Sequence, residues 1–419
     1  MTSVPIRIHR PGAVTLTALP PLSLYVHLPW CLKKCPYCDF NSHEVMLAPK
    51  TPSASPAQGG VSGLGRRGAG PASFDESRYV DALFADLESA LPQVWGRRVL
   101  SVFIGGGTPS LFSPAAIERL LGGIRARLPL EPGCEITLEA NPGTFERERF
   151  RAFASAGVTR LSVGVQSFDD AMLQVLGRVH DAAQARAAVD EARRAFATFN
   201  IDLMYALPGQ SLAHLQRELD TALSFEPPHL SIYHLTIEPN TAFASAPPAD
   251  LPDADAASEM LDAISARTRA VGLARYEVSA FARPGHRCAH NLNYWQFGDY
   301  LGIGAGAHGK LSFPDRIIRQ VRWREPVMYV DKAPAGHAVS NEHVVTADAL
   351  PFEYMLNALR LVDGFELTRF AERTGLSASV IEPTLARAQE RGLIERDGPR
   401  VRASVRGFDF LSDLQSMFL

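Results

Sequence analysis

The sequence predicts an α/β fold, in which a partial, TIM-like (β/α)6 barrel is followed by a small C-terminal α+β module. Two observations predict it. From Leu24 onward, short runs of apolar and β-branched residues alternate with longer amphipathic segments, which is typical of parallel βα units. From about residue 345 the pattern becomes helical and ends in a hairpin-like pair around Asp397, Gly398 and Pro399, which favours a winged-helix-like module.

Six short segments have the composition of buried strands. They are residues 22–28, 99–105, 135–140, 159–166, 200–207 and 229–237. Between them, Tyr79, Leu83 and Leu87 recur at helical spacing, so residues 78–91 are expected to form a helix. A second expected helix covers residues 113–128, with Ser113 as its cap and Pro114 at its first position.

The pattern divides the chain into parts. We expect a leader at 1–21, a barrel with its extension at 22–310, a connecting region at 311–345 and a C-terminal accessory domain at 346–419. Residues 47–73 are rich in Pro, Gly, Ala and Ser and have little periodicity. Such a composition buries too little apolar surface to offset the entropy of ordering, so a mobile insertion is expected there.

The overall composition excludes several classes of protein. Hydrophobic residues make up 46% and charged residues 21%, as in ordinary globular proteins. A net charge of -3 does not favour nucleic acid as a partner. The five cysteines are odd in number and clustered, which indicates a reducing cytoplasmic setting rather than a secreted disulfide framework. The sequence is compatible with peripheral membrane association and leaves open whether the chain is a monomer or a dimer.

Three of the cysteines lie on one short loop after the first predicted strand. Cys31, Cys35 and Cys38 have the spacing C-x3-C-x2-C. Three thiolates can bind three irons of a [4Fe–4S] cluster and leave the fourth iron open to another ligand. Two alternatives stay open at this point: a zinc site completed by His27 or His43, and three free thiols.

This spacing, with Tyr37 before the last cysteine, resembles the radical S-adenosylmethionine superfamily. The resemblance implies that the amino and carboxylate groups of S-adenosylmethionine supply the missing iron ligands. It also implies that an electron from the cluster cleaves a carbon–sulfur bond of the cofactor to make a 5′-deoxyadenosyl radical. The fold expected from it is the radical S-adenosylmethionine form of the partial barrel.

Further residues lie where parallel strands end, the usual place for ligands in such folds. A glycine-rich turn follows the second strand, and without side chains it lets backbone groups approach a ligand closely. By resemblance to the oxygen-independent coproporphyrinogen III oxidase branch of the superfamily, S-adenosylmethionine is expected to contact Tyr25, Tyr37, Gly106, Gly107, Thr108, Glu139, Gln166, Arg178, Asp202 and His308. Taken singly, these residues could equally be caps and strand-end hydrogen-bonding groups.

Two features depart from that oxidase branch. Phe40 stands where those oxidases have a further cysteine, and only about 30 residues precede Cys31. Together with the CPYCDFNSH and HNLNYW motifs, these departures resemble heme chaperones of the HemW type, which bind heme and deliver it to respiratory-chain proteins. This resemblance implies heme as cargo, heme-accepting respiratory proteins as partners and an electron donor for the cluster.

The HNLNYW motif has groups suited to heme. His290 offers an imidazole for the iron, and Tyr294 and Trp295 offer flat apolar faces for the porphyrin. The alternative is a packed aromatic turn. Cys288 and His286 are rival ligands.

Two functions therefore remain open, with the heme chaperone favoured over a coproporphyrinogen III oxidase that decarboxylates two propionates through a 5′-deoxyadenosyl radical. The sequence assigns no catalytic residue firmly. The remaining cysteine, Cys134, is expected to be a small buried hydrophobic residue.

Overall fold

The computed structural model describes residues 14–45, 75–143 and 149–419. The insertion predicted at 47–73 lies outside these residues. Within the described ranges, none of the helices combines the length and the apolar character that a membrane crossing requires.

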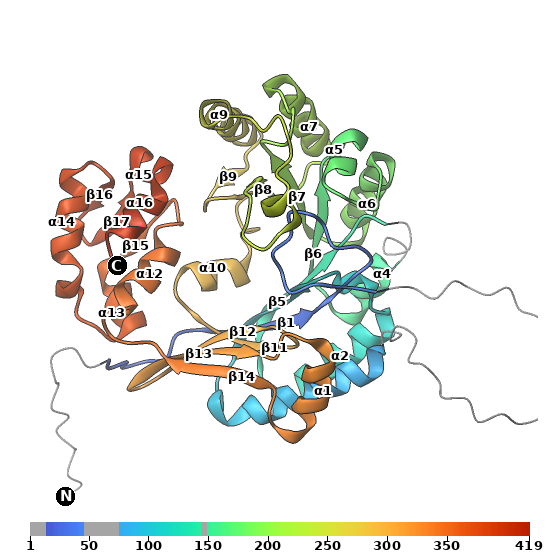
Figure 1. Cartoon of the computed structure of the whole chain (residues 1–419). Coiled ribbons are helices and arrows are strands. Elements are labelled where there is room, and N and C mark those ends of the chain that lie inside the picture. Colours follow the sequence, from blue (N-terminus) through green and yellow to red (C-terminus); the bar gives the residue numbers. More distant parts are fainter. Residues whose placement is uncertain (1–13, 46–74, 144–148) are drawn as a thin grey trace, which may run out of the picture.

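Six parallel strands form the centre of the main sheet (Figure 1). They are β1 (Leu22–Leu28), β4 (Val99–Gly106), β5 (Leu130–Ala140), β6 (Arg160–Gln166), β7 (Thr198–Tyr205) and β8 (His229–His234). Each lies beside the next in this order, as consecutive βα units do. The six predicted strands are confirmed, although β5 begins at Leu130 rather than residue 135 and β8 ends at His234 rather than residue 237.

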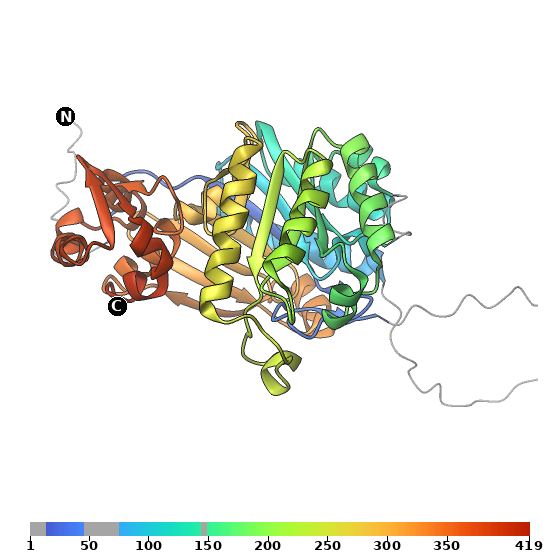
Figure 2. The ribbon, with the colours of Figure 1, turned by 90° about the horizontal axis from the view of Figure 1, so that it is seen from above.

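Helices follow these strands in the chain, and most of them cover the outer face of the sheet (Figure 2). They are α1 (Glu76–Ala90), α2 (Pro114–Arg127), α4 (Phe150–Ala156), α5 (Asp170–Val175), α6 (Ala182–Ala195), α7 (Leu212–Ser224), α8 (Ala242–Ser245) and α9 (Ala254–Ala270), with the 3-10 turns η1 (Leu91–Gln93) and η2 (Pro109–Leu111). The predicted cap of α2 is confirmed, because the Ser113 hydroxyl accepts a hydrogen bond from the Ala116 backbone N–H. Apolar residues of α1 and α2, among them Leu83 and Ile117, pack in the same core as the strands.

Further strands extend the sheet at both ends. They are β11 (Asp299–Ile303), β12 (His308–Phe313), β13 (Arg316–Arg322) and β14 (Val339–Val344) beyond β1, and β10 (Ala280–Ala282) and β9 (Ala274–Arg275) beyond β8. Residues 311–345, expected as a connecting region, therefore include sheet strands together with α11 (Pro326–Lys332) and η3 (Ala333–Ala335). The sequences of β13 and β14 contain charged and polar residues and lack the continuous apolar run of a buried strand, so the sequence pattern does not predict them.

The C-terminal module has its own core and its own small sheet, with strand order β15-β17-β16. Its elements are α12 (Leu350–Ala358), β15 (Phe365–Glu366), α13 (Leu367–Thr374), η4 (Ala378–Val380), α14 (Glu382–Glu390), β16 (Ile394–Asp397), β17 (Arg400–Ala403), α15 (Val405–Asp409) and α16 (Leu411–Ser416). Strands β16 and β17 are antiparallel neighbours, which confirms the hairpin predicted around Gly398. Tyr354 and Phe370 are fully buried in this core.

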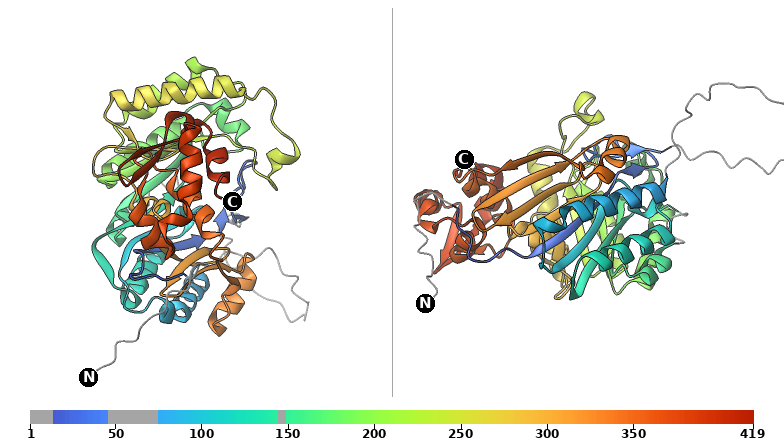
Figure 3. Two further views of the ribbon diagram at one scale, coloured as in Figure 1. Left: turned by 90° about the vertical axis from the view of Figure 1, so that its left-hand side faces the viewer. Right: turned by 90° about the horizontal axis from the view of Figure 1, so that it is seen from below.

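The described end of the leader runs beside the C-terminal module (Figure 3). The Thr15 backbone N–H donates to the Gly375 carbonyl at 3.2 Å, and the Leu16 N–H donates to the Pro314 carbonyl at 2.9 Å. Leu16 is buried in the core of the module. The leader therefore joins the module to the barrel before it enters β1.

Helix α10 (Ala289–Trp295) lies between the barrel and the C-terminal module (Figure 1). The Asn293 side chain donates from Nδ2 to the Ser23 hydroxyl on β1 at 2.9 Å. Near this helix, the Val362 N–H of the C-terminal module donates to the carbonyl of Tyr276, the residue after β9, at 3.1 Å. The open side of the barrel is thus bordered by α10 and by the start of the C-terminal module.

Candidate functional site

Two adjoining cavities open at the carboxyl ends of the parallel strands. One, here called the thiol cavity, has a volume of about 550 Å³ and is lined by the three loop cysteines. The other, here called the aromatic cavity, has a volume of about 490 Å³ and is lined by residues of β1 and α10. Asp39, Phe40, Gly106 and Glu139 line both cavities, so the two are neighbours.

The cysteine loop leaves β1 and is held by a short pair of strands, β2 (Trp30–Cys31) and β3 (His43–Glu44). Cys31, Cys35 and Cys38 are all half-buried and line the thiol cavity. Burial raises the pKa of the Cys31 thiol and of the Cys38 thiol.

A cation lies beside these thiols. Arg178 donates from Nη1 to the Cys35 sulfur at 3.5 Å and from Nη2 to the Gly164 carbonyl at 2.8 Å. This guanidinium places a fixed positive charge against the Cys35 sulfur. Three thiols that line one cavity, with an adjacent fixed cation, fit the requirements of an iron–sulfur cluster that leaves one iron without a protein ligand.

The glycine-rich turn lies directly against this loop. The Gly107 N–H donates to the Leu28 carbonyl at 2.8 Å, and the Thr108 N–H donates to the Trp30 carbonyl at 2.7 Å. A Cβ atom on Gly107 would lie 2.5 Å from the Trp30 carbonyl oxygen, which is too close for any side chain. Glycine is therefore needed here for the close approach of two backbone segments.

The zinc alternative finds no support in His27, whereas the Nε2 atom of His43 is buried without a hydrogen-bond partner. Both ring nitrogens of His27 have partners, the Tyr25 hydroxyl at 2.9 Å and the Asn41 carbonyl at 2.8 Å. Burial lowers the pKa of His27 to about 4. In the described part of the chain, no three Cys, His, Asp or Glu side chains converge closely enough to hold a single ion. A cluster differs in this respect, because its thiolates bind separate irons.

Two half-buried carboxyl groups line the thiol cavity. Glu139 accepts a hydrogen bond from the Gly106 N–H at 3.1 Å. Burial, and secondarily the charge of Asp202, raise the pKa of Glu139 to about 7. Asp202 accepts hydrogen bonds from Ser162 at 2.9 Å and from Asn200 at 2.8 Å, and burial raises its pKa. Partly buried acceptors of this kind suit the cationic and hydroxyl groups of a ligand.

The raised pKa of Glu139 predicts a pH dependence of stability. Between about pH 4.5 and 7 the folded chain holds a proton on Glu139 that the unfolded chain has released, so the free energy of unfolding falls as the pH rises through this window. Urea unfolding of the chain without cofactors, at several pH values, should show a flatter profile for Glu139→Gln than for the wild type. Glu118→Gln, at an exposed site on α2, should keep the wild-type slope; equal slopes for all three proteins would contradict the expectation.

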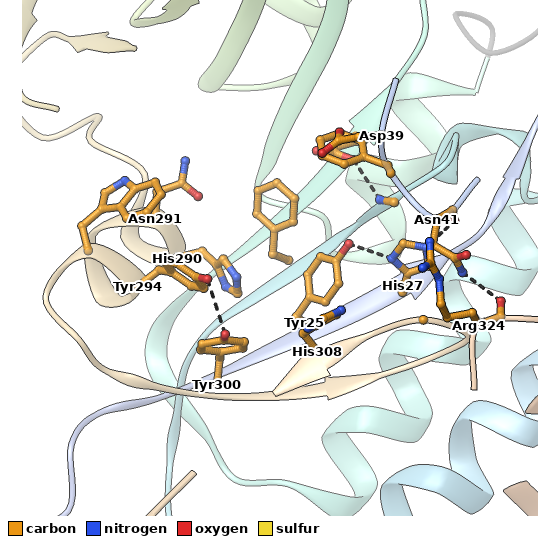
Figure 4. A pocket seen from close by; sticks show the side chains of 16 residues that line it. Tyr25, His27, Asp39, Asn41, His290, Asn291, Tyr294, Tyr300, His308 and Arg324 are labelled. Atoms are coloured by element: carbon orange, nitrogen blue, oxygen red, sulfur yellow. Dashed lines mark hydrogen bonds between the residues drawn. The ribbon is translucent and has the colours of Figure 1, made fainter. Parts of the chain in front are cut away.

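The aromatic cavity lies between α10 on one side and β1 on the other (Figure 4). The His290 ring lies 5.0 Å from the Phe103 ring and 6.3 Å from the Tyr25 ring, measured between centroids, and its Nδ1 lies 3.3 Å from the Ser101 hydroxyl. Burial lowers the pKa of His290 to about 3, so its imidazole is neutral at neutral pH, the form that binds metals. The Trp295 Nε1 atom is buried without a hydrogen-bond partner.

The expected S-adenosylmethionine contacts divide between the cavities. The thiol cavity brings together Tyr37, Gly106, Gly107, Thr108, Glu139, Gln166, Arg178 and Asp202 with the three cysteines. Tyr25 and His308 line the aromatic cavity instead, with His290, Tyr294 and Trp295. His308 is exposed, and Tyr25 uses its hydroxyl to hold His27.

The rival heme ligands lie away from both cavities. The Cys288 thiol is buried and donates to Glu135 Oε1 at 3.5 Å. His286 Nδ1 lies 2.9 Å from the Thr198 hydroxyl, at the amino end of β7. Cys134, expected to be buried, is only half-buried, because it lies in the irregular first half of β5, before the strand pairs closely with its neighbours.

A buried chain of hydrogen bonds, which sequence patterns do not reveal, links the thiol cavity to the start of α10. The Asn200 Nδ2 atom donates to Asp202, which leaves the Asn200 Oδ1 atom to accept from His229 Nδ1 at 2.6 Å. Burial lowers the pKa of His229 well below its usual value, so the ring is neutral and its Nε2 accepts from the Tyr276 hydroxyl at 2.9 Å. The Tyr276 oxygen in turn accepts from the Cys288 N–H at 3.3 Å. Each buried polar group on this path is therefore satisfied.

Asn141 is another site residue that the sequence analysis missed. Its Nδ2 donates to the Thr108 hydroxyl at 2.8 Å and its Oδ1 accepts from Arg178 at 2.6 Å, so it connects the glycine-rich turn to the cation beside Cys35. Its position directly after β5, two residues beyond Glu139, is the signal that could have identified it.

Comparisons with known proteins agree on the family. Residues 25–222 match the model of the radical SAM superfamily, and residues 345–410 match that of the HemN C-terminal domain. The chain is 44% identical to the heme chaperone HemW of Escherichia coli, over 96% of this chain and 100% of that protein. It is 42% identical to HemW of Haemophilus influenzae, over 96% and 98% of the two chains, and 33% identical to HemW of Bacillus subtilis, over 92% and 96%.

A solved structure has the same fold. Coproporphyrinogen III oxidase (HemN) of Escherichia coli superimposes with a TM-score of 0.76, covering 96% of this chain and 90% of the other. The identity is 23%, so this likeness concerns the fold alone.

Proposed function

Since this chain belongs to the HemW family of heme chaperones, within the radical SAM superfamily, we propose that it binds heme and transfers it to respiratory-chain proteins. The observation that carries the proposal is the aromatic cavity, which a neutral imidazole and several aromatic rings line together. In this proposal, heme binding and transfer take place in the cytoplasm, with heme-accepting proteins and an electron donor as partners.

The family implies a [4Fe–4S] cluster and S-adenosylmethionine. We assign the cluster to Cys31, Cys35 and Cys38, and the cofactor to the residues around the glycine-rich turn, Glu139 and Asp202. When bound, the cluster and S-adenosylmethionine supply one-electron chemistry at a site next to the proposed heme site. Arg178 would place its positive charge beside the cluster, while Gly106 and Gly107 let the turn lie directly against His27 and the Trp30 backbone.

Heme is assigned to the aromatic cavity. His290 supplies the imidazole, and Tyr294 and Trp295 supply flat surfaces for the macrocycle. The Ser101 hydroxyl beside His290 Nδ1 orients the ring, as the partners of metal-binding histidines commonly do.

Replacing His290 by alanine tests this assignment. Heme titration of the anaerobically purified variant should show a shifted Soret band and an affinity reduced at least about ten-fold, because the iron loses its imidazole. His343→Ala, at an exposed site on β14, should bind heme as the wild type does. An unchanged Soret band and affinity in His290→Ala would mean that another residue binds the iron.

The alternative function, decarboxylation of coproporphyrinogen III, predicts a different product. The oxidases have a further cysteine at the position that Phe40 occupies in this chain. Phe40 is 59% exposed and lines both cavities, so neither cavity has a thiol at this position. Release of carbon dioxide from coproporphyrinogen would favour that alternative, whereas binding of intact heme favours the chaperone.

A further inference from the structure

Arg360 is the one described residue beyond position 345 that lines either cavity. It follows α12, at the point where the C-terminal module meets the open side of the barrel. Its guanidinium lies over the Trp295 ring, with the Cζ atom 4.2 Å from the ring centroid. Because Trp295 lines the aromatic cavity and Arg360 lines the thiol cavity, their contact connects the linings of the two cavities.

The charge of Arg360 is only partly compensated. Its Nη2 lies 3.3 Å from Oε2 of the buried Glu277, while its Nε is buried with no hydrogen-bond partner. The neighbouring Arg275 donates to the backbone carbonyls of Glu277 and Val278, which adds a second positive charge beside the same carboxylate. An arginine has five N–H donors in a planar fork, so Arg360 keeps donors for another acceptor.

Stacking and ion pairing also hold this guanidinium in place. Its side chain is 28% exposed, so a carboxylate that reached it would leave bulk water and form a charge-assisted hydrogen bond in a partly buried site. Arg324, at the rim of the aromatic cavity, is exposed and would bind such a group less strongly.

We propose that Arg360 recognises a propionate carboxylate of the bound tetrapyrrole, so that the C-terminal module takes part in cargo binding. This inference rests on the proposed function. The macrocycle would lie against the aromatic side chains of α10, and its carboxylate edge would face the guanidinium that stacks on Trp295. Heme binding would then also tie the C-terminal module to the barrel.

The test compares hemin with hemin dimethyl ester, which has the same ring and iron without free carboxylates. The wild-type chain should bind the diacid about ten- to hundred-fold more tightly than the ester. In Arg360→Gln this preference should largely disappear, while affinity for the ester stays close to that of the wild type. Arg360→Lys keeps the charge and should retain part of the preference.

A matched control is Arg287→Gln. Arg287 also joins the barrel to the C-terminal module, through an ion pair with Asp363 at 2.9 Å, but it lines neither cavity. It should keep the full preference for the diacid. An undiminished preference in both Arg360 variants, or its loss in Arg324→Gln instead, would overturn the inference. A wild-type chain that binds neither ligand would contradict the proposed function itself.

Discussion

Replacing Cys35 by alanine is expected to abolish the [4Fe–4S] cluster. The loop supplies three thiolates, so the loss of one leaves a second iron without a protein ligand, and Arg178 loses the sulfur to which it donates. Anaerobic reconstitution followed by absorption and electron paramagnetic resonance spectroscopy measures the effect directly. Heme binding need not vanish with the cluster, because His290 and Trp295 lie on another element, α10.

Cys134→Ala is the matched control for this variant. Cys134 is also half-buried, but it lies in the first half of β5 and lines neither of the two cavities. Its replacement should leave the cluster signals at wild-type strength. A normal cluster in Cys35→Ala would exclude the assignment of the loop cysteines.

Asp86→Ala is expected to destabilise the barrel by about 3–5 kcal/mol, because it leaves the guanidinium of Arg322 buried without its carboxylate. Both side chains are 1% exposed, and the ion pair joins them at 3.3 Å. Asp86 also accepts hydrogen bonds from the Tyr329 hydroxyl at 2.9 Å and the Gly304 N–H at 3.3 Å. The loop from Gly304 to His308 borders the aromatic cavity, so heme affinity should fall as well.

Urea unfolding of Asp86→Ala and Asp81→Ala, compared with the wild type, measures this effect. Asp81 lies on the same helix, α1, and its ion pair with Arg119 is largely exposed, with side chains 61% and 44% accessible. Loss of such a pair should change the free energy of unfolding by less than about 1 kcal/mol. Similar effects in the two variants would show that burial does not decide the contribution of Asp86.

The parallel core of the fold follows from local patterns in the sequence. The strands around Leu24 and Val163 are rich in apolar residues and largely buried, because both faces of a parallel sheet are covered. The Ser113 cap and the turn at Gly398 depend on residues next to each other in the chain. The cysteine loop and the strand-end residues were predictable for the same reason.

The remaining features depend on contacts between distant residues. Strand β13 contains polar residues whose partners are distant in the sequence. Arg319 donates to Glu353 and Gln320 donates to Glu342, and no local pattern indicates those partners. Likewise, the aromatic stack of Arg360 forms only when the C-terminal module meets α10. A single sequence cannot show which distant polar residue will satisfy which buried group.

The most direct test of the central proposal uses the anaerobically reconstituted wild-type chain. One sample receives heme, and another receives coproporphyrinogen III with S-adenosylmethionine and a reductant; heme spectra and porphyrin masses are then recorded. The proposal predicts stable binding of heme of unchanged mass and no change in coproporphyrinogen III. Two successive losses of carbon dioxide from coproporphyrinogen III, without stable heme binding, would contradict it and identify the chain as an oxidase.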